Sequence, residues 1–206
     1  MYYETDRNDH GLRHNPLKAC VVPRPIGWIS TISPVGVVNL APFSFFNLVS
    51  ADPAFVAFSA GMHERDHGKK DTVANIEATG EFVHNLATWT QRDAMNRTSL
   101  ITEHGVDELA AVGLEALPSR LVRPPRVKGA PVHFECRLHE IVRLPGRTTR
   151  DDYHLVIGKV VAVHIDDDAL TPDGRLDVLK VRPIARLGYK DYSSIDAVFE
   201  MERPIR

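Results

Sequence analysis

The alternation of apolar and polar residues predicts a hairpin near the start of the chain. The segments 28–33 (WISTIS) and 37–41 (VVNLA) have strand-like composition and flank the turn residues Pro34 and Gly36. The following stretch, 42–53 (PFSFFNLVSADP), interrupts the alternation with two prolines and a cluster of aromatic residues. We therefore expect a loop there, between strands.

The same pattern predicts a second hairpin made of two long strands. Residues 132–144 and 153–165 are alternating or β-branched runs, and the turn-like segment 145–152 separates them. Shorter strands are expected at 54–60, 81–87 and 178–187.

A helix is expected between the strands at 54–60 and 81–87. Asp71 and Thr72 can cap a helix over 73–79, because short polar side chains accept the free amides of a first turn. Gly80 supplies the stop.

Two further helices are expected before the long hairpin. Thr90 and Asp93 resemble a capping box at the start of a helix over 91–102. A brief third helix is expected within 107–113. Residues 117–131 carry four prolines, so we expect an extended connection across the surface.

Strands of antiparallel character with helices inserted between them favour one fold class. We expect a mainly β structure with inserted helices, closed into a small barrel, rather than a parallel α/β fold. The length of 206 residues fits a single domain over 1–206, with a polar N-terminal segment at 1–15.

Composition and charge narrow the class of partner. A formal net charge of −2, from 25 basic and 27 acidic residues, argues against binding to nucleic acid or to an anionic membrane. The start of the chain lacks the pattern of a secretory signal, and no apolar run approaches the roughly 20 residues of a spanning helix. We therefore predict a cytoplasmic location and two buried free thiols, Cys20 and Cys136.

One short motif suggests a metal and is rejected on its context. Residues 63–67 (HERDH) match the zinc-peptidase pattern H-E-x-x-H, which works when a helix places both histidines on one face. Here the pentad lies between Gly61 and Gly68, and no apolar periodicity surrounds it, so a helix would bury little. We predict a polar loop with no metal at His63 and His67, solvated or close to an anionic ligand.

Polar residues at the end of the first hairpin point to a phosphorylated ligand. Ser30 and Thr31 precede the turn and Asn39 follows it, so hydroxyls, an amide and irregular backbone gather at one end. Lys70 adds an ammonium group, and Thr72 lies at a predicted helix N-terminus, whose amides favour an anion. There is no G-x-G-x-x-G or P-loop pattern.

These residues belong to longer segments that resemble the flavin reductase-like family with the FMN-binding split-barrel fold. The resemblance runs from Pro23 almost to the end of the chain. It is carried by 23–61 (PRPIGWISTISPVGVVNLAPFSFFNLVSADPAFVAFSAG), 69–87 (KKDTVANIEATGEFVHNLA), FEC at 134–136, IGKVVAVHIDD at 157–167, DGRLD at 173–177, RPIARLGYKDYSSI at 182–195, and the final ERP.

The resemblance implies a homodimer with FMN near the subunit interface. Ser30, Thr31 and Lys70, with Arg24 as a further candidate, would meet the phosphate and ribityl chain. Residues 39–47 would line the isoalloxazine, mostly through backbone. The implied contacts are Arg24, Ser30, Thr31, Asn39, Leu40, Ala41, Ser44, Phe45, Phe46, Asn47, Ser59, Lys70 and Thr72.

Several of these residues also allow a purely structural role. Arg24, held between Pro23 and Pro25, suits an anion but fits a rigid surface turn equally well. At least one of the three phenylalanines in 43–46 is expected in the core.

Two positions depart from the family pattern. Some relatives carry a histidine directly after an aspartate, close to the nicotinamide, whereas here Tyr153 separates Asp152 from His154. His154 is therefore either a substrate-binding residue for nicotinamide or a strand-end histidine exposed to water. Tyr189 stands where relatives often have a second glycine after Gly188.

Two functions follow from the resemblance. The first is an FMN-dependent NAD(P)H oxidoreductase, which transfers hydride from NADH or NADPH to flavin and supplies a monooxygenase or another electron acceptor. It needs no catalytic acid–base pair from the protein, because the cofactors carry the chemistry. The second is an FMN-binding electron carrier without nicotinamide activity.

Overall fold

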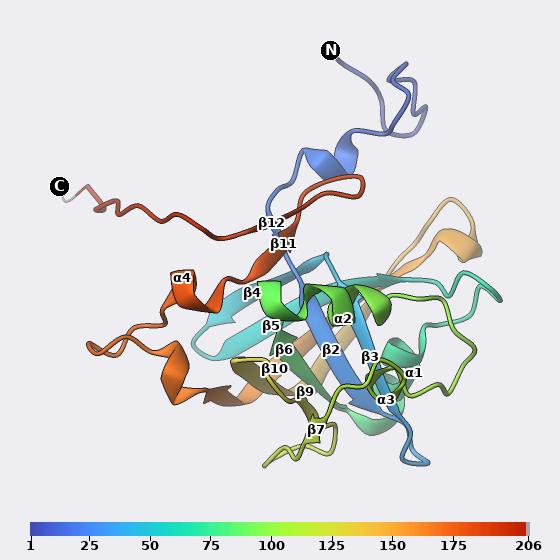
Figure 1. Cartoon of the computed structure of the whole chain (residues 1–206). Helices are drawn as coiled ribbons and strands as arrows, with labels where there is room; N and C mark the ends of the chain where they lie inside the picture. The colour runs from blue at the N-terminus through green and yellow to red at the C-terminus, as the bar shows by residue number, and fades with distance from the viewer. Residues whose placement is uncertain (205–206) are drawn as a thin grey trace.

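The computed structural model describes residues 1–204, and its centre is one large antiparallel sheet (Figure 1). Seven strands pair in the order β3-β2-β6-β9-β10-β5-β4. Their bounds are β2 Gly27–Ile32, β3 Val38–Phe43, β4 Phe46–Ala51, β5 Ala54–Gly61, β6 Glu81–Leu86, β9 Val132–Leu144 and β10 Tyr153–Ile165. The prediction of a mainly β fold is confirmed.

The sheet rolls up until its two ends face each other across a shared core. β3 and β5 are the first and the sixth strands in this order, five places apart, yet the ring centroids of Phe43 on β3 and Phe58 on β5 are 4.9 Å apart. Phe46 of β4 stacks on His84 of β6 at 4.4 Å. Gly27 of β2 permits this closure, because a Cβ atom there would lie 2.5 Å from the Phe46 ring. The result is a barrel.

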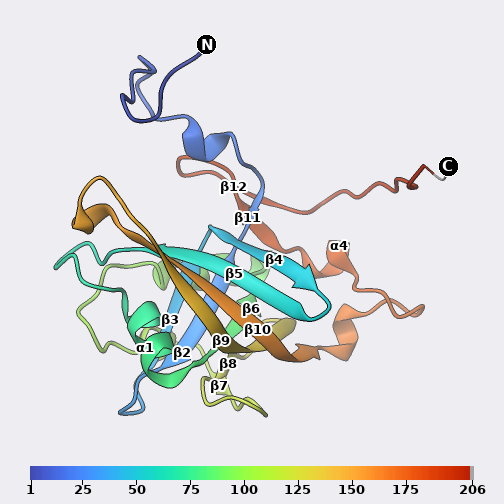
Figure 2. The same cartoon turned by 180° about the vertical axis from the view of Figure 1, so that it is seen from behind.

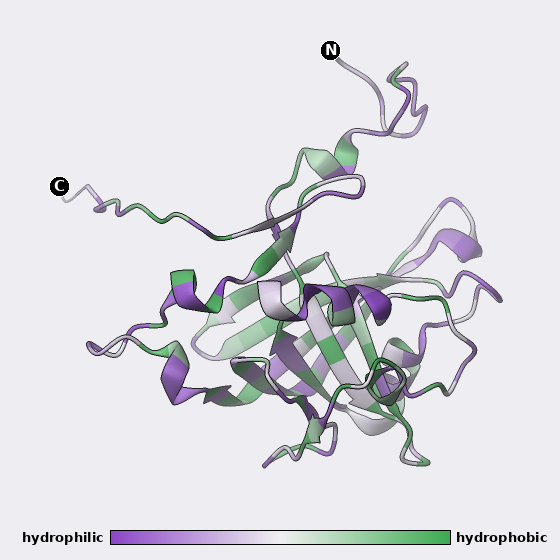
Figure 3. Cartoon of the chain, viewed as in Figure 1, coloured by the Kyte–Doolittle hydropathy of each residue, from purple (hydrophilic) through white to green (hydrophobic). Residues whose placement is uncertain are grey.

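Both predicted hairpins are present. β2 pairs with β3, and β9 pairs with β10 over the full predicted lengths of 132–144 and 153–165. Figure 2 shows β4, β5 and β10 side by side on the opposite side of the barrel from that in Figure 1. The tip of the long hairpin is largely hydrophilic (Figure 3).

The expected loop over 42–53 is wrong, because half of it forms the edge strand β4. β4 pairs only with β5, so its backbone needs hydrogen-bond partners along one side alone. Pro42 is the last residue but one of β3, which is the other edge strand, and Pro53 lies in the turn between β4 and β5. Proline is tolerated at edges and turns, so it did not exclude a strand.

Smaller sheets complete the fold. A three-stranded sheet joins β1 Arg24–Pro25, β11 Ile184–Arg186 and β12 Tyr192–Ser194. The proline-rich connection holds only the two-residue strands β7 Ala116–Leu117 and β8 Arg126–Val127, as its composition predicts. The strand expected over 178–187 is wrong in its first half, which forms helix α4 Val178–Val181 with Asp177 as its cap.

The helices are short, and α1 is the longest within residues 1–204. α1 Asp71–Thr79 packs on β2 and buries Val73 and Ile76, and Gly80 ends it at φ +73°, as predicted. The others are α2 Arg92–Arg97, α3 Glu108–Ala111, and the 3-10 helices η1 Leu17–Ala19, η2 Trp89–Gln91, η3 Thr149–Asp151 and η4 Asp167–Ala169.

Three predictions about caps and thiols are wrong. Lys70, not Asp71 or Thr72, is the N-cap residue of α1, and it makes no side-chain cap bond. The second helix is shorter than 91–102 and begins after Gln91, while Thr90 bonds Thr88 instead of capping. Cys20 is exposed, and only Cys136 is buried as expected.

Candidate functional site

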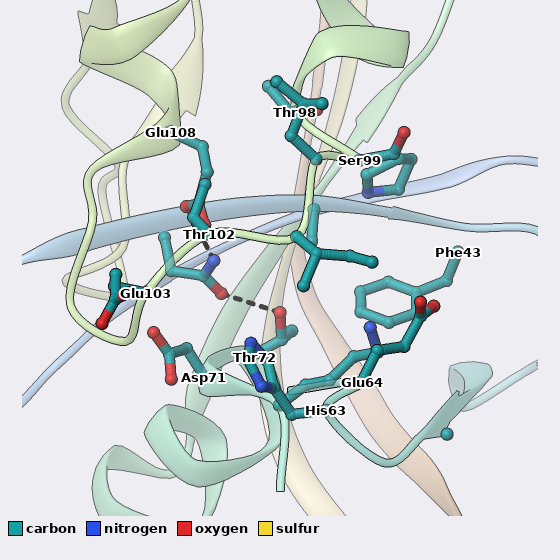
Figure 4. Close-up of a pocket in the computed structure, with 17 residues that line it drawn as sticks. Phe43, His63, Glu64, Asp71, Thr72, Thr98, Ser99, Thr102, Glu103 and Glu108 are labelled. Carbon is teal, nitrogen blue, oxygen red and sulfur yellow. Dashed lines mark hydrogen bonds between the residues drawn. The ribbon is translucent and has the colours of Figure 1, made fainter. Parts of the chain in front are cut away.

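A cavity lies where the end of β3, the start of α1 and the segment 98–103 meet (Figure 4). Its volume is about 160 Å³. Ligand pockets usually hold roughly 300–1,000 Å³, so a ligand of flavin mononucleotide size would extend beyond it. The lining residues are Asn39, Ala41, Pro42, Phe43, Gly61, His63, Glu64, Lys70, Asp71, Thr72, Glu108 and all residues of 98–103.

The start of α1 brings an ammonium group and free amides to a cavity that is also lined by the carboxyl groups of Glu64, Asp71, Glu103 and Glu108. Lys70 lines the cavity from the N-cap position, with an extended backbone at φ −62° and ψ 146°. The first amides of a helix have no intrahelical acceptor, so those of Asp71 and Thr72 favour an anion there. The ammonium of Lys70 and these amides both attract an anion.

Buried hydrogen bonds fix the wall opposite the helix. The Asn39 side chain donates to Glu108 Oε2 at 2.8 Å and accepts from Thr72 Oγ1 at 2.7 Å. Glu108 Oε2 also accepts from the backbone N–H of Leu40 at 3.0 Å. Asn39 thus joins β3 to α1 and α3, and both ends of its side-chain amide are used in hydrogen bonds within the protein.

The predicted pair Ser30 and Thr31 does not converge on this cavity. Neighbouring residues of a strand point to opposite faces, and both side chains are fully buried. Ser30 Oγ donates to the carbonyl of Pro125 at 2.5 Å, on the face of Trp28. Thr31 Oγ1 donates to Asn39 Oδ1 at 3.3 Å on the other face and accepts from Asn75.

Arg24 lies in a different place from Lys70. It is buried and its Nη1 donates to the carbonyls of Lys18, Val21 and Leu187, which ties the N-terminal segment to the C-terminal one. Burial, together with nearby Arg186, lowers the pKa of Arg24. Arg24 is therefore not part of an exposed turn, and its contact with FMN stays a prediction.

An aromatic ledge continues from the cavity toward Arg24. Tyr153 packs over Gly61, a cavity residue, where an added Cβ would lie 3.3 Å from the ring. The Tyr153 and Phe45 rings are 6.0 Å apart, and the Arg24 guanidinium lies 5.7 Å from the Phe45 ring. This path of Gly61, Tyr153 and Phe45 is called the ledge below.

The remaining predicted contacts occupy three settings. Leu40 is fully buried in the core, and Phe46 is packed against the core. Asn47 is exposed on β4. Ser44 and Ser59 are half-buried, and the N–H of Ser59 donates to the carbonyl of Phe45 at 2.8 Å. The structure therefore gathers Asn39, Ala41, Lys70 and Thr72 at the cavity, and Phe45 on the ledge.

His154 faces a second cavity beside the first. It is buried, so the alternative of a water-exposed histidine is wrong, and its Nδ1 has no hydrogen-bond partner within residues 1–204. Met62, Lys69 and Glu77 line this second cavity with it. Asp152 also lines it, and the pKa of that carboxyl is lowered by the Arg143 guanidinium, at 2.6 Å, and the Gly146 amide.

Sequence reasoning missed several cavity residues. Phe43 lies within the predicted segment 39–47 but was not named as a contact, and it is buried while also lining the cavity. Glu108 carried no sign of a site, since it follows a cap in a short helix. Residues 98–102 were assigned to a helix, whereas the segment 98–103 runs as irregular backbone along the cavity.

Comparison with known proteins places the chain in a family. The family model of the flavin reductase like domain matches residues 19–189. An uncharacterized protein of Aquifex aeolicus (strain VF5) is 39% identical over 192 residues, which are 93% of this chain and 94% of that protein. The chain belongs to the flavin reductase-like domain family.

Solved structures agree with this assignment. Nitrilotriacetate monooxygenase component B from Bacillus cereus matches at 27% identity with a TM-score of 0.88, covering 98% of each chain. The 2-nitrobenzoate 2-nitroreductase NbaA of Pseudomonas fluorescens matches in fold, at 24% identity and a TM-score of 0.84, over 99% of this chain and 96% of that one. The split barrel predicted from the sequence is confirmed.

The helices of the structure were also compared with the length of a membrane span. Within residues 1–204, none combines the length and the apolar character that a crossing would require.

Proposed function

We propose that this chain binds FMN in the cavity beside Lys70 and uses it to oxidise NADH or NADPH. The observation that carries this proposal is the meeting of Lys70 and the α1 N-terminus with the β3 wall in one cavity. A helix N-terminus with an adjacent lysine is suited to a phosphate group. Membership of the flavin reductase-like family supports a flavin as the rest of the ligand.

The residues present fit a phosphorylated flavin that extends beyond the cavity. Lys70 and the amides of Asp71 and Thr72 would hold the phosphate. The ring would lie along Ala41 to Phe43 and the ledge, where apolar and aromatic side chains gather. When bound, FMN supplies the hydride chemistry.

The protein contributes binding, orientation and exclusion of water. Phe43 lines the cavity from the core side and keeps that wall apolar. The bonds of Asn39 to Glu108 and Thr72 hold the wall and the helix start at a fixed separation. Such rigid positioning is what hydride transfer between two stacked rings requires of a protein.

Two uses of the reduced flavin are compatible with the neighbours. One solved neighbour is component B of a monooxygenase, which supports transfer to a partner monooxygenase. The other is a nitroreductase. The second candidate function is an FMN-binding electron carrier with no nicotinamide activity. In the first candidate, the oxidoreductase, His154 is the residue that we propose for contact with the nicotinamide.

We also propose that the chain forms a homodimer. Edge strand β4 exposes Leu48 and Val49, and the chain ends extend away from the barrel with Val198 and Phe199 exposed (Figure 1). A second copy would cover such surfaces. Light scattering coupled to gel filtration should give twice the mass of 23.0 kDa, and a monomer at micromolar concentration would refute this assembly.

Two measurements test the function. Titration of the flavin-free protein with FMN, followed by flavin fluorescence, should show saturable binding, with riboflavin much weaker because it lacks the phosphate. Stopped-flow mixing of the FMN-loaded protein with NADH or NADPH should bleach the flavin absorbance. A protein that binds FMN and is bleached by neither nucleotide is the electron carrier, and one that ignores FMN refutes both candidates.

A further inference from the structure

The loop that contains residues 63–67 does not form a helix, and it meets a distant loop instead. His67 adopts φ +59° within a turn, which separates it from the helical geometry of H-E-x-x-H, as predicted. His63 instead packs on His104, with ring centroids 4.5 Å apart. The candidate cavity passes between these loops, because His63 and Glu103 both line it.

Three ligand atoms converge between the two loops. His63 Nδ1 lies 3.2 Å from one oxygen of Asp66, and His104 Nε2 lies 2.8 Å from the other. One donor atom from each of these three residues lies within 4.8 Å of the other two. Ligands of a tetrahedral zinc ion, with bonds near 2.0–2.1 Å, lie roughly 3.3 Å from one another. A small inward shift would therefore complete the site.

A fourth residue has the role of an outer carboxylate. Asp71 bonds the remaining ring nitrogen of His104, Nδ1, and its second oxygen accepts from the Gly105 amide at 2.8 Å. Metal-bound histidines commonly donate their other N–H to a carboxylate, which fixes the tautomer and the ring orientation. With Nδ1 bonded to Asp71, His104 turns Nε2 toward Asp66, and a metal ion between the two would replace their 2.8 Å contact.

The surroundings are suited to a cation. Arg65, on the same loop as His63, is paired with Glu103 at 2.6 Å. Glu64 is a further carboxylate on the same loop. Two imidazoles and a carboxylate are borderline donors that suit zinc and similar transition metals, whereas magnesium and calcium prefer oxygen alone.

We propose that His63, His104 and Asp66 bind one zinc ion, with Asp71 as a positioning residue. The ion joins the loop before α1 to the segment 98–104 and so holds one wall of the candidate cavity in place. The site shares His63 with the H-E-x-x-H pair but does not use His67. Its three protein ligands leave a fourth position for water. It does not depend on the flavin proposal.

The test measures zinc directly. The purified chain is stripped with a chelator, incubated with Zn²⁺ and dialysed, and its zinc content is measured by mass spectrometry and by calorimetric titration. We expect one zinc per chain, lost in His63→Ala and in His104→Ala, and no heat with Mg²⁺. Asp71→Asn should weaken zinc binding by roughly tenfold to a hundredfold.

His67→Asn is the matched control. His67 lies on the same loop and is exposed, and asparagine tolerates its left-handed backbone. This variant should keep its zinc, whereas the H-E-x-x-H site would lose it. The proposal is overturned if the native chain retains no stoichiometric zinc, or if His104→Ala binds zinc as tightly as the native chain. Circular dichroism of each variant shows that the fold is retained.

Discussion

The Asn39 side-chain amide donates a 2.8 Å hydrogen bond to the buried carboxylate of Glu108, and this bond joins strand β3 to helix α3. The same carboxylate oxygen accepts from the Leu40 backbone. A negative charge is thus kept in the protein interior by donors from the strand that carries the candidate cavity. The cavity wall and the stability of the fold depend on the same contact.

Glu108→Ala should therefore destabilise the protein and weaken FMN binding together. It leaves two buried donors without an acceptor, and such losses cost about 1–3 kcal/mol each. We expect the free energy of unfolding in urea to fall by about 2–6 kcal/mol. Glu103→Ala is the control, because Glu103 also lines the cavity but is exposed in a surface ion pair worth about 0–1 kcal/mol. Equal losses in both variants would contradict this assignment.

Two adjacent lysines allow a matched test of the phosphate position. Lys70 lines the cavity, whereas Lys69 does not and pairs with Glu77 at 2.6 Å. A hydrogen bond to a charged group contributes about 1.5–3 kcal/mol, so Lys70→Ala should raise the Kd for FMN by roughly 10- to 100-fold. Lys69→Ala should change it by less than about twofold. Riboflavin, which has no phosphate, should bind Lys70→Ala and the native chain alike.

Gly158 of β10 tests how closely the barrel is packed. A Cβ atom at this position would lie 2.3 Å from Phe82 Cζ, and the Phe82 ring is fully buried. Overpacking of a core costs about 1–3 kcal/mol, so Gly158→Ala should lower the thermal midpoint. Adding Phe82→Leu should recover part of that loss, because the shorter side chain vacates the contact. Strictly additive losses in the double variant would show that the two positions do not meet.

Sequence patterns were sufficient where each residue contacts its own neighbours. The long strands 132–144 and 153–165 and the helix ended by Gly80 follow from alternation and from local backbone preference. Patterns failed where distant segments decide the outcome. The sequence predicted Asp71 as a helix cap, but its carboxylate instead bonds the His104 ring and the Gly105 N–H of another loop.

The candidate site also combines residues that local sequence patterns predict with residues that only tertiary packing brings there. Lys70 and Thr72 reach the cavity because α1 begins there, and the helix was predictable. Ser30 and Thr31 share a sequence motif, yet strand geometry sends them to opposite faces. Glu108 and the segment 98–103 join the cavity only through tertiary packing, which no local pattern encodes.

A buried histidine should make the fold sensitive to acid. His84 lies in the barrel between Phe46 and Phe134, and burial, with a smaller effect of His133, lowers its pKa to about 3. The folded state therefore resists protonation that the unfolded chain accepts below pH about 6.5. The contribution of neutral His84 to stability is complete above that pH and is lost as the pH falls toward 3.

The expected slope is about 1.4 kcal/mol per pH unit for this one group below pH 6.5. Urea unfolding of the native chain at pH 7.0, 6.0 and 5.0 should show the decline, with the contribution of His133, whose pKa is lowered to about 4 by burial, added to it. His84→Leu replaces the titrating imidazole by an apolar side chain of similar size. The free energy of unfolding of this variant should therefore fall less steeply between pH 7.0 and pH 5.0. A variant whose pH profile parallels that of the native chain would show that His84 is not the group responsible, and acid sensitivity would then rest with His133 and the carboxylates.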